Sequence, residues 1–433
     1  MKISKYNFYL KKNDAYIGIN LKTLIPIKVN CNTFNILSQP ESNINIIKEQ
    51  NPSFFNLLLK LGFIILDDHN EQEELIIKHR LTVYSTQGYR LTIVPTLGCN
   101  LRCWYCYEEH FEEYMDEKNI DTILKFVESL IKNNNLKTFH LDWFGGEPML
   151  CFKEIIYPLS QKIKELCEKH NILFRNSITT NGVLIDQSIV EAINDIQLYH
   201  YQITLDGGKE EHNRVRKTTS NEGTFNRIIN NINLLLENLD NVNITLRINY
   251  TKKNLPSIGE IIDYIPPVFR KRVTVAFQQV WQTKVNGDID SWNYRKKFEC
   301  NDFRSIGVFP GVHCKCYADL FNQCVILPNY DVFKCTARDF KKHPADGFLS
   351  STGRIHWNST FHKRLSKTTI ERKICLECDV LPVCWGPCSQ KLIEAANGKE
   401  SVNECSYKTH YKSLINNIML EYCDKISSSD PNI

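Results

Sequence analysis

The sequence predicts an α/β protein built on a parallel sheet, with a small α+β unit before the sheet and a cysteine-rich region after it. Between residues 90 and 280, apolar strands alternate with amphipathic helices. The first 84 residues instead contain short strands and turns followed by helices, and after about residue 300 cysteine and proline replace the alternation. We therefore expect three domains in the chain of 433 residues: 1–84, 85–300 and 301–433.

Residues 1–84 are expected to fold as a compact α+β module. The segment YNFYLKKNDAYIGINLKTLIPIKVN contains strand-like runs broken by Asn-Asp and Gly-Ile-Asn turns. A helix at CNTFNILSQ follows, and then SFFNLLLKLGFIIL reads as a helix that runs into a strand. The acidic stretch DDHNEQEEL and the helix after it connect this module to the next domain.

The central region contains six strand candidates separated by helical patterns. The strands are expected at residues 90–97, 139–145, 175–182, 198–207, 243–251 and 273–280. Apolar residues recur at helical spacing from Ile120 to Ile131 and again in TFNRIINNINLLLENL. Six strand-helix units in series form a parallel sheet, which is either an open doubly wound layer or a barrel, since periodicity fits both.

The seventeen cysteines are unevenly distributed, and twelve of them lie in two zones, residues 99–106 and 314–405. In a reducing cytosol, clustered thiols of this kind indicate metal ligands or catalytic groups rather than structural disulfides. The remaining cysteines stand singly and are expected to be packing residues or idle thiols. They are Cys31, Cys151, Cys167, Cys300 and Cys423.

Charge and hydropathy exclude several classes of protein. Lys and Arg number 53 against 49 Asp and Glu, and the small excess is spread along the chain, so no nucleic-acid partner is expected. No run of about 18 apolar residues indicates a membrane span, and the first residues lack the hydrophobic stretch of a secretion signal. We expect a cytoplasmic protein that does not bind a membrane.

The stretch GCNLRCWYCYEEH carries Cys99, Cys103 and Cys106 in a C-x3-C-x2-C spacing directly after the first strand of the sheet. Three thiolates can hold three irons of a [4Fe-4S] cluster and leave the fourth iron open to a small molecule. The alternative is a structural zinc site completed by His110, although such sites normally show paired C-x2-C knuckles.

This motif resembles the signature of the radical S-adenosylmethionine (SAM) superfamily. The resemblance implies a partial (β/α)6 barrel and a cluster whose open iron is chelated by the amino and carboxylate groups of SAM. An electron from the cluster then cleaves SAM to a 5'-deoxyadenosyl radical. Tyr105 occupies the family's aromatic position beside the adenine. In GGEP, Gly145 and Gly146 allow close backbone approach and Glu147 pairs with the ammonium group of SAM.

Two further stretches and one strand match the same template. SITTNG supplies small polar groups for the carboxylate or ribose of SAM, and TLDGGKEEHNRVR resembles a family stretch, with Asn213 where Asp is usual. The resemblance thus adds Ser177, Thr180, Asn181, Asp206, Arg216, Arg247 and Asn249 as candidate cofactor-binding residues. The alternative is that these polar groups satisfy local backbone at the strand ends. Asp206 is a candidate for a catalytic role, while a general base stays unassigned.

The C-terminal motif CLECDVLPVCWGPC resembles the SPASM domain, an extension that carries two auxiliary [4Fe-4S] clusters. The resemblance assigns the second auxiliary cluster to Cys375, Cys378, Cys384 and Cys405. The first is assigned to Cys316, Cys324, Cys335 and Cys388, with Cys314 as the substitute for Cys316. Tyr330 stands where the family has a glycine, and we expect Asn329 to supply the left-handed residue of that turn. A zinc ribbon is the alternative for the tail.

Together these features predict a radical SAM/SPASM maturase that makes an oxidative cross-link, or a related change, in a ribosomally synthesised precursor peptide. The expected cofactors are SAM and three [4Fe-4S] clusters, and a flavodoxin or ferredoxin is the expected low-potential electron donor. The N-terminal module resembles the winged-helix element that holds a leader peptide, by adding a strand to a sheet edge. The alternatives are an anaerobic sulfatase-maturing enzyme that forms formylglycine and, from another class, a non-catalytic iron-sulfur electron carrier or metal-stapled binding protein.

Overall fold

The computed structural model describes residues 1–12, 14–39, 43–280, 282, 291–306, 315–366, 369–396, 405 and 419. Their contacts group into two compact units, and each unit combines stretches that are far apart in the sequence. The first unit takes the described residues within 1–84, 307–319 and 363–433, and the second takes those within 85–306 and 320–362. The division into three consecutive domains stays a prediction.

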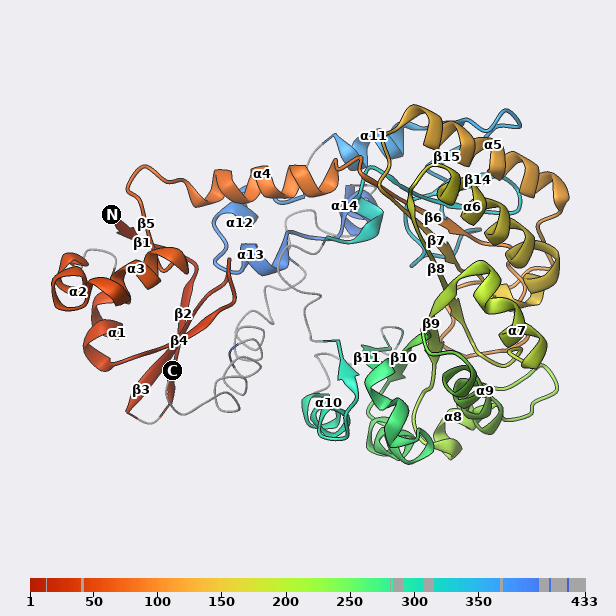
Figure 1. Cartoon of the computed structure of the whole chain (residues 1–433), viewed down its shortest axis with the longest axis horizontal. Helices are drawn as coiled ribbons and strands as arrows, with labels where there is room; N and C mark the ends of the chain where they lie inside the picture. The colour runs from red at the N-terminus through yellow and green to blue at the C-terminus, as the bar shows by residue number, and fades with distance from the viewer. Residues whose placement is uncertain are drawn as a thin grey trace. The chain divides into compact units, whose positions relative to one another are not determined.

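The second unit is built on six parallel strands that lie side by side in chain order (Figure 1). They are β6 (Gly88–Ile93), β7 (Thr138–Trp143), β8 (Leu173–Thr180), β9 (Leu198–Thr204), β10 (Asn243–Tyr250) and β11 (Val273–Gln279). Right-handed crossovers between neighbours that follow the chain order place every connecting helix on the same face of the sheet. The sheet is therefore the expected partial barrel, and the doubly wound alternative is wrong.

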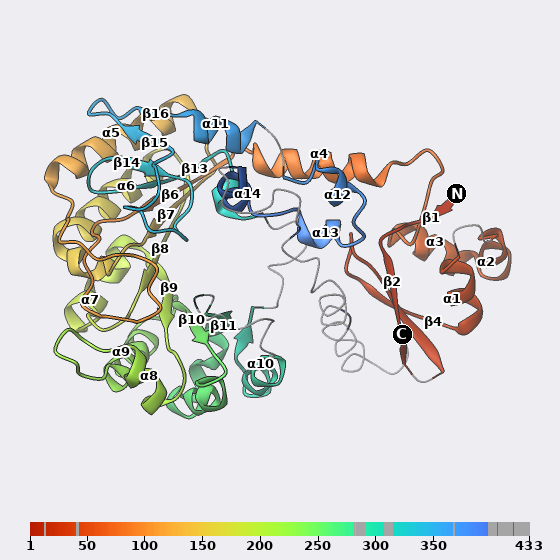
Figure 2. The same ribbon diagram turned by 180° about the vertical axis from the view of Figure 1, so that it is seen from behind.

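The helices of this unit follow the outer face of the curved sheet, as the view from behind also shows (Figure 2). They are α5 (Glu117–Asn133), α6 (Tyr157–Lys169), α7 (Gln187–Ile196), α8 (Lys209–Val215), α9 (Phe225–Asn238) and α10 (Trp292–Glu299). Shorter 3-10 or π turns of this unit lie at Pro148–Cys151, Phe152–Ile156, Leu255–Tyr264 and Pro267–Arg272, and a 3-10 turn of the first unit lies at Tyr317–Asp319. The helices expected around Ile120 and around residues 224–239 are confirmed as α5 and α9.

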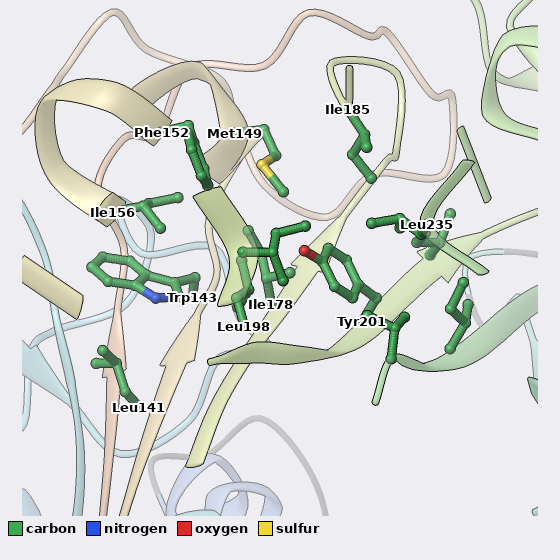
Figure 3. Close-up of a cluster of buried hydrophobic side chains, with 14 of the residues drawn as sticks. Leu141, Trp143, Met149, Phe152, Ile156, Ile178, Ile185, Leu198, Tyr201 and Leu235 are labelled. Carbon is green, nitrogen blue, oxygen red and sulfur yellow. The ribbon is translucent and has the colours of Figure 1, made fainter. Parts of the chain in front are cut away.

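The core of the second unit lies between the sheet and these helices. Alternate residues of each strand point into it, and Figure 3 shows Trp143, Ile178 and Tyr201 from the strands beneath Phe152 and Ile156. Helix α5 begins with a capping box, in which Asp116 and Asn119 each bond the other's backbone N–H. Its buried face then repeats every three or four residues through Ile120, Ile123, Val127 and Ile131.

The sheet continues beyond the six predicted strands into the cysteine-rich region. The added strands are β12 (Arg304–Ser305), β13 (Gln323–Ile326), β14 (Asp331–Phe333), β15 (Gly347–Leu349) and β16 (Ile355–Trp357). Strand β13 pairs in parallel with β6, and β14 to β16 extend from it as antiparallel neighbours. The free edge of β6 is thus paired, which the sequence pattern did not reveal because these strands have only two to four residues.

The turn before Cys335 differs from our expectation. Tyr330 itself has the left-handed backbone, with φ of 68°, and Asn329 does not. The side-chain oxygen of Asn329 accepts a hydrogen bond of 3.1 Å from the backbone N–H of Asp331 instead. The expectation that Asn329 supplies the left-handed residue in place of the missing glycine is therefore wrong. Its side-chain amide oxygen instead satisfies a backbone N–H of the turn.

The first unit combines the N-terminal module with the C-terminal cysteine loops. Its strands are β1 (Lys2–Ile3), β2 (Asn7–Lys12), β3 (Ala15–Asn20), β4 (Pro26–Val29) and β5 (Ile64–Ile65). Its first four helices are α1 (Cys31–Leu37), α2 (Asn45–Gln50), α3 (Pro52–Lys60) and α4 (Glu71–Val83). Further along the chain lie α11 (Ser359–Leu365), α12 (Lys373–Leu376), α13 (Leu381–Cys384) and α14 (Ser389–Ala396).

One hydrophobic core of the first unit joins residues from both ends of the chain. Tyr6 and Ile19 of the N-terminal module pack with Cys375, Leu381 and Trp385 of the cysteine loops. The carbonyl oxygen of Leu376 accepts hydrogen bonds from the Lys5 ammonium at 2.8 Å and from the Gln72 amide at 2.6 Å. The module and these loops therefore fold as one body.

Two sequence predictions concern helices that the structure tests only in part. Over the described residues, no helix is both long enough and apolar enough to cross a membrane. The helix expected at THYKSLINNIMLEYC lies outside the described residues, apart from Met419.

Candidate active site

The loop that carries the three clustered cysteines is closed at its base by backbone hydrogen bonds. It leaves β6 and returns to α5, and the N–H of Met115 donates to the carbonyl of Pro95 over 2.8 Å. The N–H of Leu97 likewise donates to the carbonyl of Glu113 over 3.1 Å. Further out, the N–H of Arg102 bonds the carbonyl of Lys217. The sequence between these anchors is thereby held over the carboxyl ends of the parallel strands, where α/β proteins bind their ligands.

A cavity at this edge of the sheet gathers most of the predicted site residues. Those that line it are Cys99, Cys103, Tyr105, Cys106, Gly145, Gly146, Thr180, Asn181, Arg216, Arg247 and Asn249. They come from loops and strand ends spread over 151 positions of the sequence, from Cys99 to Asn249. The fold thus brings to one place the groups that the motifs predicted separately.

The thiols of Cys99 and Cys103 are half-buried, and that of Cys106 is exposed. Desolvation raises the pKa of Cys99 to about 12 and that of Cys106 to about 11, and it also raises the pKa of Cys103. Iron would bind these thiols by displacing their protons.

The geometry of the thiols bears on the kind of metal site that fits. Over the described residues, no three His, Cys, Asp or Glu side chains are gathered as ligands of one metal ion. In a cubic cluster each thiolate binds a different iron, so three thiols that share one cavity fit that group. His110, the fourth ligand of the zinc alternative, also lines the cavity, and its Nδ1 lies 3.3 Å from the carbonyl oxygen of Leu97.

The glycines of GGEP are required by the close approach of two backbone segments. A Cβ at Gly146 would lie 2.2 Å from the carbonyl oxygen of Gly98. Gly145 has φ of +129°, and a Cβ there would lie 2.5 Å from the carbonyl oxygen of Thr96. The N–H of Glu147 completes the contact with a hydrogen bond of 2.8 Å to Gly98. Any larger residue would push the GGEP turn away from the cysteine loop.

Three predicted residues, Glu147, Ser177 and Asp206, do not line the cavity. The Glu147 carboxylate is fully buried and accepts hydrogen bonds from the Thr180 hydroxyl at 2.6 Å and from the backbone N–H groups of Asn181 and Met149 at 2.7 and 3.0 Å. In this arrangement it ties the GGEP turn to the end of β8. Ser177 lies earlier on β8, and its hydroxyl donates to the Asp142 carboxylate.

A buried polar network forms the wall of the cavity beside Tyr105. The Tyr105 hydroxyl donates to the Asp206 carboxylate and accepts from Arg216 at 2.8 Å and from the Asn249 amide at 3.1 Å. Burial raises the pKa of Tyr105 and of Asp206, and the Arg216 charge opposes both shifts. Asp206 faces a second cavity that also contains Arg214 and Lys253. Its carboxylate therefore organises the wall rather than reaching into the cysteine cavity.

Several residues of the cavity were missed by the motifs. They are Glu108, Thr179, Gln202, Thr204, Gln278, Gln279 and Gln282. The alternation along the strands is the signal that could have found Thr179 and Gln278, because Thr179 lies on the same face of β8 as the predicted Ser177, and Gln278 pairs directly with the predicted Asn249. Gln202 pairs with Thr179 on the next strand. Burial, followed by the nearby Asp339 charge, raises the pKa of Glu108 to about 8.

The cysteines predicted for the second auxiliary cluster come together in the first unit. The Cys405 thiolate is close enough to raise the pKa of Cys375, Cys378 and Cys384, after the larger effect of burial. Cys375 belongs to the hydrophobic core, and Cys378 and Cys384 pack against it. This group fits a cluster held by four protein thiolates.

The set predicted for the first auxiliary cluster stays a prediction. Cys324 lies on β13 and Cys335 follows β14, both in the second unit. Cys316 and Cys388 belong to the first unit, and Cys314 lies outside the described residues.

Comparisons with known proteins find one family model that is similar to this part of the chain. The model of the radical SAM superfamily matches residues 93–265. The cysteine-type anaerobic sulfatase-maturating enzyme of Clostridium perfringens is 30% identical over 141 residues, which are 30% of this chain and 36% of that enzyme. The match thus spans about a third of that curated relative.

Two solved structures share the fold. The sulfatase-maturating enzyme anSMEcpe, with bound AdoMet and a Cp18Cys peptide, aligns with a TM-score of 0.56 at 19% identity over 79% of this chain and 99% of that chain. Streptococcus suis SuiB, bound to its precursor peptide SuiA, aligns with a TM-score of 0.51 at 18% identity over 94% of this chain and all of that chain. The expected fold class, with its cysteine-rich C-terminal region, is confirmed.

A domain of this superfamily implies a [4Fe-4S] cluster and SAM, and the cavity described above has the thiols and the glycine cradle that such a pair requires. The expectation of an enzyme is confirmed, so the non-catalytic electron carrier is not retained. The part of the chain that resembles the radical SAM superfamily, residues 93–265, is also the part that carries the cysteine loop and the GGEP turn.

Proposed function

We propose that this enzyme modifies a ribosomally synthesised precursor peptide, by an oxidative cross-link or a related change. The observation that carries the proposal is the extent of the fold likeness. The match to SuiB covers 94% of this chain, whereas the match to anSMEcpe covers 79%. The longer match takes in most of the N-terminal module as well as the barrel. Because SuiB is bound to a precursor peptide in that structure, a peptide substrate is the natural proposal for this chain.

The N-terminal module supports the proposal through its free sheet edges. In the order β2-β3-β4, the outer strands β2 and β4 each have one edge without a partner strand among the described residues. An extended leader peptide can add a strand to such an edge through main-chain hydrogen bonds. The module shares its core with the loops of the second auxiliary set, so a leader held there would be fixed to the body that carries those thiols.

The chemistry of the cavity follows from the cofactors that the superfamily implies. A [4Fe-4S] cluster with SAM supplies a 5'-deoxyadenosyl radical, which removes hydrogen from an unactivated carbon. Cys99, Cys103 and Cys106 would hold the cluster, while Arg216, Arg247 and Asn249 offer cations and amides to the polar groups of SAM. The buried wall around Tyr105 limits access of water from that side. Two auxiliary clusters would accept the electron of the substrate radical, which makes the net change an oxidation.

The test uses the small open reading frame next to this gene, if one is present, or a library of candidate precursors. The full-length enzyme is co-expressed with the peptide, and the peptide is analysed by mass spectrometry. Loss of two hydrogens in the presence of the wild-type enzyme, and not with Cys103→Ala, is the expected result. An unchanged peptide mass, although the same enzyme releases 5'-deoxyadenosine from SAM with dithionite, would overturn the proposal. A flavodoxin or ferredoxin replaces dithionite in the proposed physiological reaction.

The second candidate is a sulfatase-maturing activity that oxidises Cys or Ser to formylglycine. It is favoured by the 30% identity to the Clostridium perfringens enzyme and by the fold likeness to anSMEcpe. The two candidates separate in one assay, because formylglycine gives an aldehyde that reacts with a hydrazide probe. A sulfatase-derived peptide that gains this reactivity would favour the second candidate.

A further inference from the structure

The inner face of the barrel carries a group of charged residues that no cofactor role uses. On β7 to β9, His140, Asp142, Arg175 and His200 alternate with the buried core residues and therefore point to the opposite face from the helices. The buried side of the same strands includes Leu141, Trp143 and Tyr201, which Figure 3 shows packed beneath the helices.

The register of the strands aligns these residues across the sheet. Arg90 pairs with His140, and His140 with Arg175 on the next strand. Two residues further along β7 and β8, Asp142 pairs with Ser177, and Ser177 pairs with His200 on β9. Directly opposite residues on neighbouring strands are about 5 Å apart, so the side chains form one continuous cluster. We call Arg90, His140, Asp142, Arg175 and His200 the inner-face cluster.

The single acid of the inner-face cluster, Asp142, is ion-paired with Arg90, although its Oδ2 has no hydrogen-bond partner among the described residues. The Asp142 carboxylate lies 3.4 Å from Nε of Arg90 and accepts a hydrogen bond from the Ser177 hydroxyl. Among the described residues, Arg175 and His200 have no hydrogen-bond or ion-pair partner, and both side chains are exposed. The Arg175 charge lowers the pKa of both His140 and His200, after the larger effect of burial. Arg175 is thus a positive charge without a counterion on this face.

The inner-face cluster lies directly below the cavity of the three cysteines. Thr179 and Gln202 line that cavity, and they stand on the same face two residues after Ser177 and His200. Two strand residues span about 7 Å. A peptide that places one residue in the cavity would therefore place a residue about two to four positions away beside Arg175 and His200, since an extended chain advances about 3.3 Å per residue.

We propose that Arg175 and His200 bind the side-chain carboxylate of an Asp or Glu in the peptide substrate, close in sequence to the residue that is modified. This inference rests on the proposed function, and it adds a chemical requirement on the substrate. A guanidinium binds a carboxylate through two parallel hydrogen bonds, and an imidazole N–H at the next position supplies a further donor. The argument for this occupant is charge complementarity, because Arg175 has no ion-pair partner among the described residues, whereas the one anion of the cluster, Asp142, is ion-paired with Arg90.

The test measures binding and needs no turnover. The probes are the amidated peptides Ac-Gly-Gly-Glu-Gly-Gly-NH2 and Ac-Gly-Gly-Gln-Gly-Gly-NH2, titrated by ligand-observed NMR against the full-length enzyme with its clusters and SAM. We expect the Glu peptide to bind about tenfold more tightly, because a hydrogen-bonded charge is worth roughly 1.5–3 kcal/mol and tenfold corresponds to 1.4 kcal/mol. Equal affinities for the two peptides would overturn the inference.

Variants assign the preference to the cluster. In Arg175→Gln the preference for the Glu peptide should disappear, in His200→Gln it should fall, and in Arg175→Lys most of it should remain. Arg354→Gln removes an exposed arginine elsewhere in the same unit and should leave both affinities unchanged. An undiminished preference in both Arg175→Gln and His200→Gln, with native circular dichroism, contradicts the assignment.

A third peptide distinguishes recognition of a side-chain carboxylate from recognition of the C-terminal carboxylate of a peptide. Ac-Gly-Gly-Gly-Gly-Gly with a free C-terminus carries its only carboxylate on the main chain. If it binds as tightly as the Glu peptide, the site recognises a peptide end and the inference is wrong. Failure of the proposed function would look different, because the precursor would stay unmodified in co-expression whatever the two pentapeptides do.

Discussion

Arg216 donates a hydrogen bond of 2.8 Å to the hydroxyl of Tyr105, although 111 positions of sequence separate the two residues. The same hydroxyl donates to Asp206 and accepts from Asn249. One atom therefore connects the cysteine loop with the ends of β9 and β10 and with the segment after α8. This explains why a tyrosine, rather than any other aromatic residue, suits this position of the loop.

Tyr105→Phe tests this connection. The variant removes the hydroxyl that donates to Oδ2 of the buried Asp206 and accepts from Arg216 and the Asn249 amide, while Oδ1 of Asp206 keeps its hydrogen bond from the Asn249 backbone N–H. We therefore expect a loss of about 1–3 kcal/mol in the free energy of unfolding. The matched control is Tyr107→Phe. Tyr107 lies on the same loop as Tyr105, and its hydroxyl donates to the backbone carbonyl of Thr336. Thermal unfolding followed by circular dichroism should show the larger decrease for Tyr105→Phe. Equal melting temperatures for wild type and Tyr105→Phe would show that the hydrogen bonds of the Tyr105 hydroxyl do not stabilise the fold.

Cys103→Ala should remove the cluster of the radical SAM domain. With one thiol of three missing, we expect the anaerobically reconstituted protein to lose about four irons per chain and all release of 5'-deoxyadenosine. Cys300→Ala is the control, since Cys300 is an exposed cysteine outside every predicted ligand set. Iron analysis and chromatography of the nucleoside products check both variants. Nucleoside release at the wild-type rate by Cys103→Ala would show that the ligand assignment is wrong.

Gly146→Ala should separate the two loops that form the cavity. The added methyl group would overlap the carbonyl oxygen of Gly98, which is part of the backbone and cannot rotate away. We expect at least a tenfold weaker affinity for SAM, measured by equilibrium dialysis. In the control Gly88→Ala, the new Cβ would meet only the Thr138 hydroxyl, at 2.6 Å, and a side chain can turn aside. Comparable SAM affinity in Gly146→Ala and wild type would contradict the claim that SAM binding requires the close approach of the GGEP turn to the cysteine loop.

His79 predicts an acid sensitivity of the first unit. Its ring is buried against Trp385, neither ring nitrogen has a hydrogen-bond partner among the described residues, and burial lowers its pKa to about 4. The unfolded chain binds a proton below pH 6.5 and the folded chain does not until about pH 4. Its contribution is therefore fully present above pH 6.5 and falls by about 1.4 kcal/mol per pH unit as the pH drops toward 4.

Replacing His79 should reduce this dependence of the free energy of unfolding on pH. In His79→Phe, the melting temperature should depend less on pH between 7.5 and 5.5 than in the wild type. His356→Phe, which replaces an exposed histidine, should keep the wild-type slope. Parallel curves for wild type and His79→Phe would rule out His79 as the titrating group.

The strands and helices of the barrel were predictable because each carries a local signal. Helix α5 has a capping box at Asp116 and a buried face at helical spacing, and the six strands were found close to their observed bounds. The short strands β13 to β16 were not predicted, since three or four residues cannot display a period and the pairing of β13 with β6 connects segments over 200 positions apart. The left-handed Tyr330 was likewise unpredictable, because a local rule favours Asn329 there.

For the candidate site, the motifs found the residues whose chemistry is distinctive. The cysteines and the GGEP glycines were predicted as a set and line one cavity. Gln202, Gln278 and Glu108 were missed, because glutamines and glutamates on a strand or loop read as ordinary polar residues until a neighbour is known. The inner-face cluster was missed for the same reason, since its members belong to separate strands and meet only through the register.

The sequence by itself predicted the cysteine loop and the parallel strand-helix units, because each depends on residue types at short, fixed spacing. Only the tertiary structure decided that the sheet is a partial barrel, that Glu147 ties two loops together and that Arg175 has no counterion among the described residues. These three facts depend on the order and register of strands. Contacts between distant segments are set by how whole elements pack, and no local pattern records them.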